Sequence, residues 1–196
     1  MIKKNKILFI ISNLMLIALN SCDPYYFKLN TTKKTFELIH AVKLTDMNDV
    51  ERISDNSFKI LPNAKLALGL NKITQIYSEL NVKVSSGEGL RFSFRTVSND
   101  FENNPKISFE YLVNNSIIKE NNKIISLKNI KFDYNELKVI RILNNGNKYC
   151  VTVDCDTIYN GITNLPATEY LMIESLKETN AIISGIYMTS SNGDIK

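Results

Sequence analysis

Two pairs of carboxylates have a spacing that acid–base or metal chemistry can use. Asp100 lies two residues before Glu102, and Asp154 lies two residues before Asp156. Alternate residues of an extended strand share one face, so each pair can bring two carboxylates together. Acids in a solvated turn are the commoner explanation of such a pair, and the sequence leaves both interpretations open.

The sequence offers few groups for nucleophilic catalysis. His40 is the single histidine, and it lies in residues 35–43, which we predict to be the first strand. A serine or cysteine nucleophile needs a base beside it, and His40 is far along the chain from Cys150 and Cys155. The sequence also lacks a phosphate-binding glycine loop, a His-Glu-x-x-His segment and a G-x-S-x-G turn. We therefore expect a protein that binds its ligand without catalysing a reaction.

The clearest structural pattern is a hairpin in residues 137–154. Residues 137–143 and 149–154 are rich in β-branched side chains, and residues 144–147 between them contain the Asn-Gly pair that favours a tight turn. Along the second strand, one apolar set of side chains alternates with a more polar set. The apolar set is Tyr149, Val151 and Val153, and the polar set is Cys150, Thr152 and Asp154.

The same hairpin keeps two cysteines apart. Five steps along a strand separate Cys150 from Cys155 by about 16 Å. A disulfide bond requires the two Cα atoms to lie within about 7 Å of each other. We therefore expect no bond between these cysteines, with Cys150 on one face of the sheet and Cys155 in a turn.

Alternating apolar residues predict further strands. Residues 80–84 and 90–94 alternate on either side of the glycine-containing turn 86–89, which predicts a second hairpin. Apolar side chains also occupy every second position of residues 107–113, which follow a polar loop at residues 99–105. About ten short strands, at a spacing of roughly 8–12 residues and without a helical period, indicate an all-β fold with two antiparallel sheets in a sandwich.

The N-terminal residues have the features of an export signal. Residues 1–6 are basic, and the apolar residues 7–19 are too few to span a bilayer, which needs about 20 residues. The following Leu19-Asn20-Ser21-Cys22 resembles the lipobox of bacterial lipoproteins. This resemblance implies that Cys22 becomes the lipidated N-terminus, which anchors the protein in a membrane. The alternative is an ordinary cleaved signal peptide with an incidental cysteine.

The lipobox resemblance also implies how the chain is divided. Residues 1–21 form the signal peptide, residues 22–34 form the lipidated cysteine and a tether, and residues 35–196 form the β-sandwich domain. The expected location is the bacterial cell envelope, with the lipid anchor at the outer membrane or the cell surface.

The charge balance excludes one class of partner. The chain has 24 Lys and Arg residues and 20 Asp and Glu residues, and three of the lysines, Lys3, Lys4 and Lys6, belong to the signal peptide. The remaining chain is almost neutral, so it has no basic surface of the kind that binds nucleic acid. We expect no nucleic-acid partner.

Two segments resemble a known family. Residues 89–95 and residues 136–154 are similar to strands of concanavalin A-like and laminin G-like jelly rolls, and the resemblance covers roughly residues 58–189. It implies a jelly-roll β-sandwich. The family includes lectins, adhesion modules, glycoside hydrolases and polysaccharide lyases, so the fold favours glycan or protein binding without establishing it.

The resemblance leads to three hypotheses about function. The first is a non-catalytic, lipid-anchored envelope protein that recognises glycan or an extracellular protein. The second is a carbohydrate-active enzyme, either a glycoside hydrolase or a polysaccharide lyase, and the third is a structural envelope lipoprotein. Aromatic rings stack on sugars, so four tyrosines are candidate contacts, although each ring can equally be a packing residue. They are Tyr111, Tyr134, Tyr159 and Tyr170.

A calcium site is a further expectation. Laminin G-like domains often bind Ca²⁺ through aspartate and backbone carbonyl oxygens in the loops at the rim of the sandwich. Asp100, Asp154 and Asp156 carry hard oxygen ligands of this kind.

Overall fold

The computed structural model describes residues 41–43, 49–54, 57–73, 75–96, 106–165 and 168–191. The predicted signal peptide, Cys22, the tether, His40 and Asp100 lie outside these residues. All regular elements of the described residues are β-strands. This part of the chain contains no helix that is long and apolar enough to cross a membrane.

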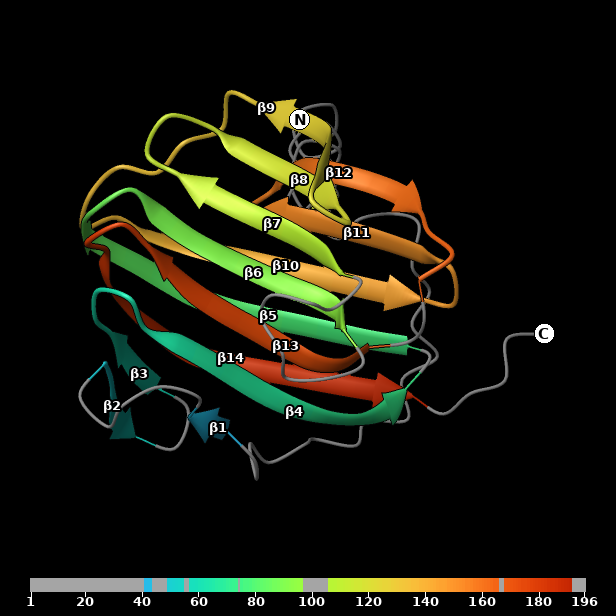
Figure 1. Ribbon diagram of the computed structural model, residues 1–196, viewed down its shortest axis with the longest axis horizontal. Coiled ribbons are helices and arrows are strands. Elements are labelled where there is room, and N and C mark those ends of the chain that lie inside the picture. Colours follow the sequence, from blue (N-terminus) through green and yellow to red (C-terminus); the bar gives the residue numbers. More distant parts are fainter. Residues whose placement is uncertain are drawn as a thin grey trace, which may run out of the picture.

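The strands form two antiparallel sheets of seven strands each, packed face to face (Figure 1). In the view of Figure 1, the front sheet has the order β1 (Ala41–Lys43), β4 (Lys65–Ile73), β13 (Thr168–Leu176), β6 (Gly89–Thr96), β7 (Ile107–Leu112), β8 (Ser116–Glu120) and β9 (Lys123–Lys128). The back sheet has the order β12 (Asp156–Ile162), β11 (Lys148–Val153), β10 (Leu137–Asn145), β5 (Gln75–Ser86), β14 (Asn180–Ser191), β3 (Ser57–Ile60) and β2 (Val50–Ser54). The predicted all-β, two-sheet antiparallel sandwich is confirmed.

The core fills the space between the sheets with alternate residues of each strand. Leu90, Phe92 and Phe94 of β6 are each at most 1% exposed, and Leu80 and Val82 of β5 are equally buried. Burying each such side chain contributes about 1.5–3 kcal/mol, so this double layer of apolar residues is the main source of stability. The ring of Phe92 stacks on that of Phe109, with the centroids 5.9 Å apart.

The predicted central hairpin is confirmed. β10 pairs with β11, and the register ends at Asn145 opposite Lys148, so Gly146 and Asn147 form a two-residue turn. Gly146 has a φ of 56°, the left-handed conformation that glycine adopts without steric cost. Tyr149, Val151 and Val153 face the core as predicted, but the opposite face is buried too: Cys150 is 1% exposed and Thr152 is 3% exposed.

The predicted second hairpin is wrong. β5 pairs with β10 and β14 in the back sheet, whereas β6 pairs with β7 and β13 in the front sheet. The chain therefore crosses from one sheet to the other between them. Gly87 has a φ of 92°, and a Cβ there would lie 2.3 Å from the Cα of Thr179, so glycine is required where the two crossing connections meet. The backbone N–H of Gly89 donates to the Thr179 hydroxyl at 3.0 Å.

Replacing Gly146 by valine tests the central turn. A β-branched residue at a positive φ is strained, so Gly146→Val should lower the free energy of unfolding by about 1–3 kcal/mol, measured by urea denaturation. Asn147→Val is the matched control, because Asn147 is exposed and has no positive φ, and its effect should stay within about 0.5 kcal/mol. Equal urea midpoints of unfolding for Gly146→Val and Asn147→Val would contradict this turn geometry.

Candidate functional site

One buried arginine joins the two sheets. The register of β6 on β13 shifts between Tyr170 and Met172, and Arg95 lies in the resulting bulge with a φ of 60°. A bulge redirects the side chain of its extra residue. Arg95 is 2% exposed, and its guanidinium reaches from the front sheet to the turn of the central hairpin in the back sheet.

The hydrogen bonds of Arg95 go to neutral groups. Its Nε donates to Oδ1 of Asn144 at 2.8 Å, and its Nη2 donates to the carbonyl oxygens of Gly146 at 2.6 Å and Lys148 at 3.1 Å. Its Nη1 lies 3.5 Å from the carbonyl oxygen of Leu165. Burial lowers the pKa of this guanidinium, and no carboxylate of the described residues pairs with it. We call these five residues the Arg95 cluster; its guanidinium is almost fully occupied, so its role is structural.

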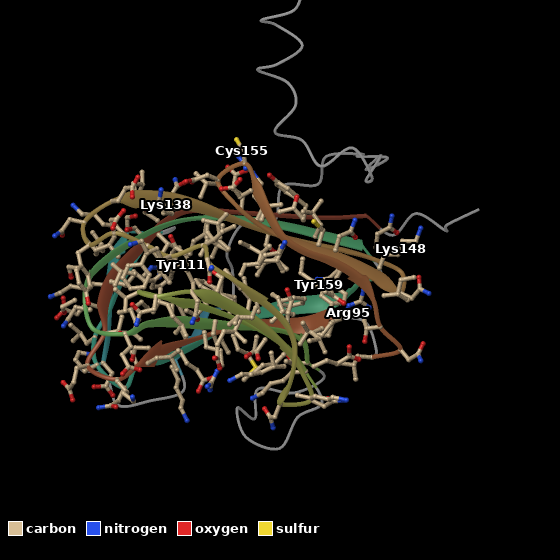
Figure 2. The ribbon with its side chains drawn as sticks, turned by 90° about the horizontal axis from the view of Figure 1, so that it is seen from above. Arg95, Tyr111, Lys138, Lys148, Cys155 and Tyr159 are labelled. Atoms are coloured by element: carbon tan, nitrogen blue, oxygen red, sulfur yellow. The ribbon has the colours of Figure 1, made fainter. Side chains whose placement is uncertain are left out.

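Two tyrosines pack beside the Arg95 cluster. The ring of Tyr149 lies edge-on against Phe94, with centroids 5.8 Å apart, and 5.5 Å from the ring of Tyr159. Figure 2 shows Tyr159 at the same end of the molecule as Arg95 and Lys148. Tyr159 is half-buried, and a Cβ at Gly161 would lie 2.2 Å from its ring, so the glycine leaves room for it. Tyr159 is therefore a packing residue along much of its ring.

A charged strip crosses the outer face of the front sheet. Arg91 of β6 bonds to Glu110 of β7 at 2.9 Å and to Glu174 of β13 at 3.3 Å, and Lys119 of β8 bonds to Glu110 at 2.7 Å. The two glutamate side chains are only 6% and 10% exposed. Different nitrogens of Arg91 contact the two carboxylates, so the guanidinium occupies the space between them. A glycosidase needs its substrate there, and the strip therefore lacks the arrangement of a catalytic pair.

A second surface forms where the chain changes sheets. The β5–β6, β9–β10 and β13–β14 connections all lie at the left-hand end in Figure 1, and we call this surface the crossover end. Within it, Tyr134 is 48% exposed. Its hydroxyl donates to the carbonyl oxygen of Gly87 at 2.8 Å, and its ring lies edge-on against Phe132 with centroids 5.6 Å apart. The backbone N–H of Asn135 donates to the carbonyl oxygen of Val84 at 2.7 Å. An exposed ring is thus fixed at its hydroxyl, its edge and its backbone.

Ion pairs lie on the chain segments next to this ring and next to its hydrogen-bond partner Gly87. Lys138 bonds to Glu136 at 2.8 Å and to Asp154 at 3.2 Å. Across the β5–β6 and β13–β14 connections, Lys177 bonds to Glu88 at 2.6 Å. These side chains offer hydrogen-bond donors and acceptors beside an apolar surface, which is the combination found in sites for small polar ligands.

The four tyrosines of the sequence prediction have different environments. Tyr111 is 1% exposed, faces the core and lies 5.2 Å from Phe132, so its proposal as a glycan contact is wrong. Tyr159 is half-buried against Tyr149, and the side chain of Tyr170 lies outside the described residues. Tyr134 is exposed and carries the candidate site.

The aspartates of the predicted calcium site do not converge in the described part of the chain. Asp154 has a φ of 52° in the β11–β12 turn, and its carboxylate accepts the Val139 N–H at 2.9 Å and pairs with Lys138. Asp156 is exposed at the start of β12. Among the described residues, no three His, Cys, Asp or Glu side chains lie close enough to hold a metal ion. These residues do not fit a calcium ion, and the hypothesis now depends on Asp100.

The cysteines lie as predicted. Cys155 is in the β11–β12 turn, and Cys150 is a free buried thiol, so no disulfide joins the two. Burial raises the pKa of the Cys150 thiol to about 11, which keeps it protonated near neutral pH. A protonated, buried thiol is a poor nucleophile.

Known structures resemble this fold. No family model and no curated protein sequence matches the chain. The exoplasmic/lumenal domain of VIP36, in its form bound to Ca²⁺ and Man3GlcNAc, is 9% identical with a TM-score of 0.59, over 84% of this chain and 93% of that domain. A Bacillus subtilis protein with a galectin-like fold is 5% identical with a TM-score of 0.54, over 72% of this chain and 85% of that protein.

A sialidase is also similar. It is 9% identical with a TM-score of 0.54, over 69% of this chain, but the match spans only 15% of the sialidase. At these identities the likeness establishes the fold alone. The chain thus has a jelly-roll β-sandwich fold similar to that of these structures.

Replacing Arg95 by lysine tests the Arg95 cluster. A lysine cannot reproduce the forked donors, so buried carbonyl groups lose their partners. Arg95→Lys should lower the free energy of unfolding by about 2–4 kcal/mol, measured by urea denaturation. Arg141→Lys is the matched control, because Arg141 is half-buried and pairs with Glu79 at the surface of the back sheet, and it should cost about 1 kcal/mol or less. If Arg95→Lys costs no more than its control, Arg95 does not join the sheets as described.

Proposed function

We propose that this chain is a non-catalytic glycan-binding protein, that lipid on Cys22 anchors it in the bacterial cell envelope, and that the crossover end contacts the sugar. The observation that carries the proposal is the exposure of Tyr134. Among aromatic side chains that the structure describes, it alone is exposed by more than about a third, at 48%.

The chemistry of a sugar suits this surface. One face of a pyranose ring presents C–H groups, and it removes apolar area from water when it lies flat on an aromatic ring. The sugar hydroxyls need donors and acceptors around that ring, which Lys138, Glu136 and Glu88 supply. Because the Gly87 carbonyl and the Phe132 ring hold Tyr134 in place, binding loses little side-chain entropy.

Binding without cleavage is supported by the arrangement of side chains in the charged strip of the front sheet. Glycoside hydrolysis requires two carboxylates about 5–9.5 Å apart with the substrate between them. In the charged strip, Arg91 lies between Glu110 and Glu174. Glycan-bound VIP36 and the sialidase share the fold, so they favour a sugar ligand without deciding between binding and hydrolysis.

Replacing Tyr134 tests the glycan site. Tyr134→Ala removes the ring and should weaken retention on an immobilised polysaccharide by about tenfold or more, whereas Tyr134→Phe keeps the ring and most of the affinity. The full chain in detergent is passed over β-glucan, mannan, chitin and alginate columns. Ile182→Ala is the control, because Ile182 is an exposed apolar side chain on the back sheet, 40% exposed. Unchanged retention by Tyr134→Ala would refute the site, and release of reducing ends would favour the enzyme hypothesis.

Replacing Cys22 tests the lipid anchor. Two or more acyl chains bind a membrane stably because each buried methylene contributes about 0.8 kcal/mol. Cys22→Ala should therefore abolish palmitate labelling and move the protein out of the membrane fraction. Ser21→Ala is a suitable control, since it keeps a small residue before the cysteine. Continued labelling of the Cys22→Ala variant would rule out lipidation at this position.

A further inference from the structure

We infer that the crossover end accepts uncharged sugars and amino sugars and rejects acidic sugars such as uronic acids. This inference rests on the proposed function, because it concerns which glycan lies on Tyr134. The charged side chains on the connections near that ring determine which sugars it accepts.

Carboxylates outnumber ammonium groups at the crossover end and at the β11–β12 turn, which joins it through the ion pair of Asp154 with Lys138. The two sets lie on the β5–β6, β9–β10, β11–β12 and β13–β14 connections or on the strand residues next to them. The carboxylates are Glu88, Asp133, Glu136, Asp154, Asp156 and Glu178, and the lysines are Lys128, Lys131, Lys138 and Lys177.

Two of the four lysines are already paired with carboxylates of the protein. Lys138 lies between Glu136 and Asp154, and Lys177 contacts Glu88. A ligand carboxylate that approached these ammonium groups would have to compete with a carboxylate of the protein already in contact. Lys128 and Lys131 are left without a carboxylate partner among the described residues.

The charges of three of the carboxylates act on one buried hydroxyl. Burial first, and then the charges of Asp154, Glu136 and Asp133, raise the pKa of the Tyr111 hydroxyl. That hydroxyl lies 3.5 Å from the backbone oxygen of Lys131, directly below the loop that carries Tyr134. The charges of these three acids therefore add up at a hydroxyl that Phe132 separates from the ring of Tyr134, which places all three acids near the proposed site.

Electrostatic interaction then ranks the ligands by charge. An acidic sugar on Tyr134 brings a like charge toward this excess of carboxylates, a neutral sugar brings none, and the ammonium of an amino sugar is attracted. Exposed charges act weakly beyond the Debye length, about 8 Å at physiological ionic strength, so the discrimination should be strongest in low salt. We expect acidic chains to bind at least about tenfold more weakly than neutral ones under those conditions.

The experiment compares three β-1,4-linked hexasaccharides that differ in charge: oligomers of glucosamine, glucose and mannuronic acid. Their affinities for the full chain in detergent are measured by calorimetry in low and high salt. We expect the glucosamine oligomer to bind most tightly, the glucose oligomer less tightly and the mannuronate oligomer most weakly. The differences in affinity should become smaller as salt is added. The double variant Asp133→Asn, Glu178→Gln should raise mannuronate affinity several-fold and leave glucose affinity unchanged. Glu51→Gln, on β2, is the control and should alter neither.

The outcomes separate the two proposals. If mannuronate binds as tightly as glucose and Tyr134→Ala weakens both, the charge selection is wrong and the glycan site stands. If glucose binds more tightly than mannuronate but Tyr134→Ala changes neither affinity, the site is elsewhere and both proposals fail. Failure of all three oligomers to bind, together with no retention on any polysaccharide column, also overturns both.

Discussion

The hydrogen bonds from Arg95 to the turn of the central hairpin set how the two sheets face each other at one end of the sandwich. Apolar contact between sheets is non-directional, so the core fixes their separation better than their relative position. A guanidinium has donors in a fixed plane, and here it contacts the carbonyl oxygens of Gly146 and Lys148 from a strand of the other sheet. The bulge at Arg95 and the glycine at position 146 are both conditions for that contact. This small polar cluster thus defines the geometry of an otherwise apolar interface.

At the opposite end of the sandwich, the two sheets are joined by the covalent connections between their strands. Three connections cross between the sheets there, and they are bonded to one another: the Gly89 N–H to Thr179, and the Tyr134 hydroxyl to Gly87. Surface loops commonly carry binding residues because a rigid scaffold positions them. At the crossover end the loops are short and joined to each other, which explains how Tyr134 can be exposed and yet fixed. Fold and proposed site are therefore consequences of the same crossovers.

The sequence predicted the faces of the strands better than their partners. Tyr149, Val151 and Val153 lie inward because alternation depends only on which face meets the core. Apolar residues also alternate in β5 and β6, and the same residues are buried whether the two strands pair in a hairpin or lie in different sheets. The alternation therefore could not distinguish the two arrangements, and the hairpin prediction was wrong. Arg95 alternates with Phe94 as a surface residue would, and the bulge that turns it inward depends on pairing with β13, far along the chain. Tyr111 lies two residues after Phe109 and four after Ile107, so the three side chains share one face of the strand. This spacing already favoured the core over a ligand.

The distribution of polar bonds is one argument for the proposal that this sandwich binds its ligand without catalysis. A catalytic acid or base must remain available to the substrate, yet Arg91, Glu110, Glu174 and Lys119 satisfy one another on the front sheet. At the crossover end, the groups next to Tyr134 are paired as well, so they can share hydrogen bonds with a sugar but add little net energy. One ring with such neighbours gives a weak single contact. Under the proposed function, many lipid-anchored copies face a repeating polysaccharide, and weak contacts then give strong retention because each later contact forms at high effective concentration. The proposed lipid anchor and the proposed sugar site are therefore complementary parts of one binding mechanism.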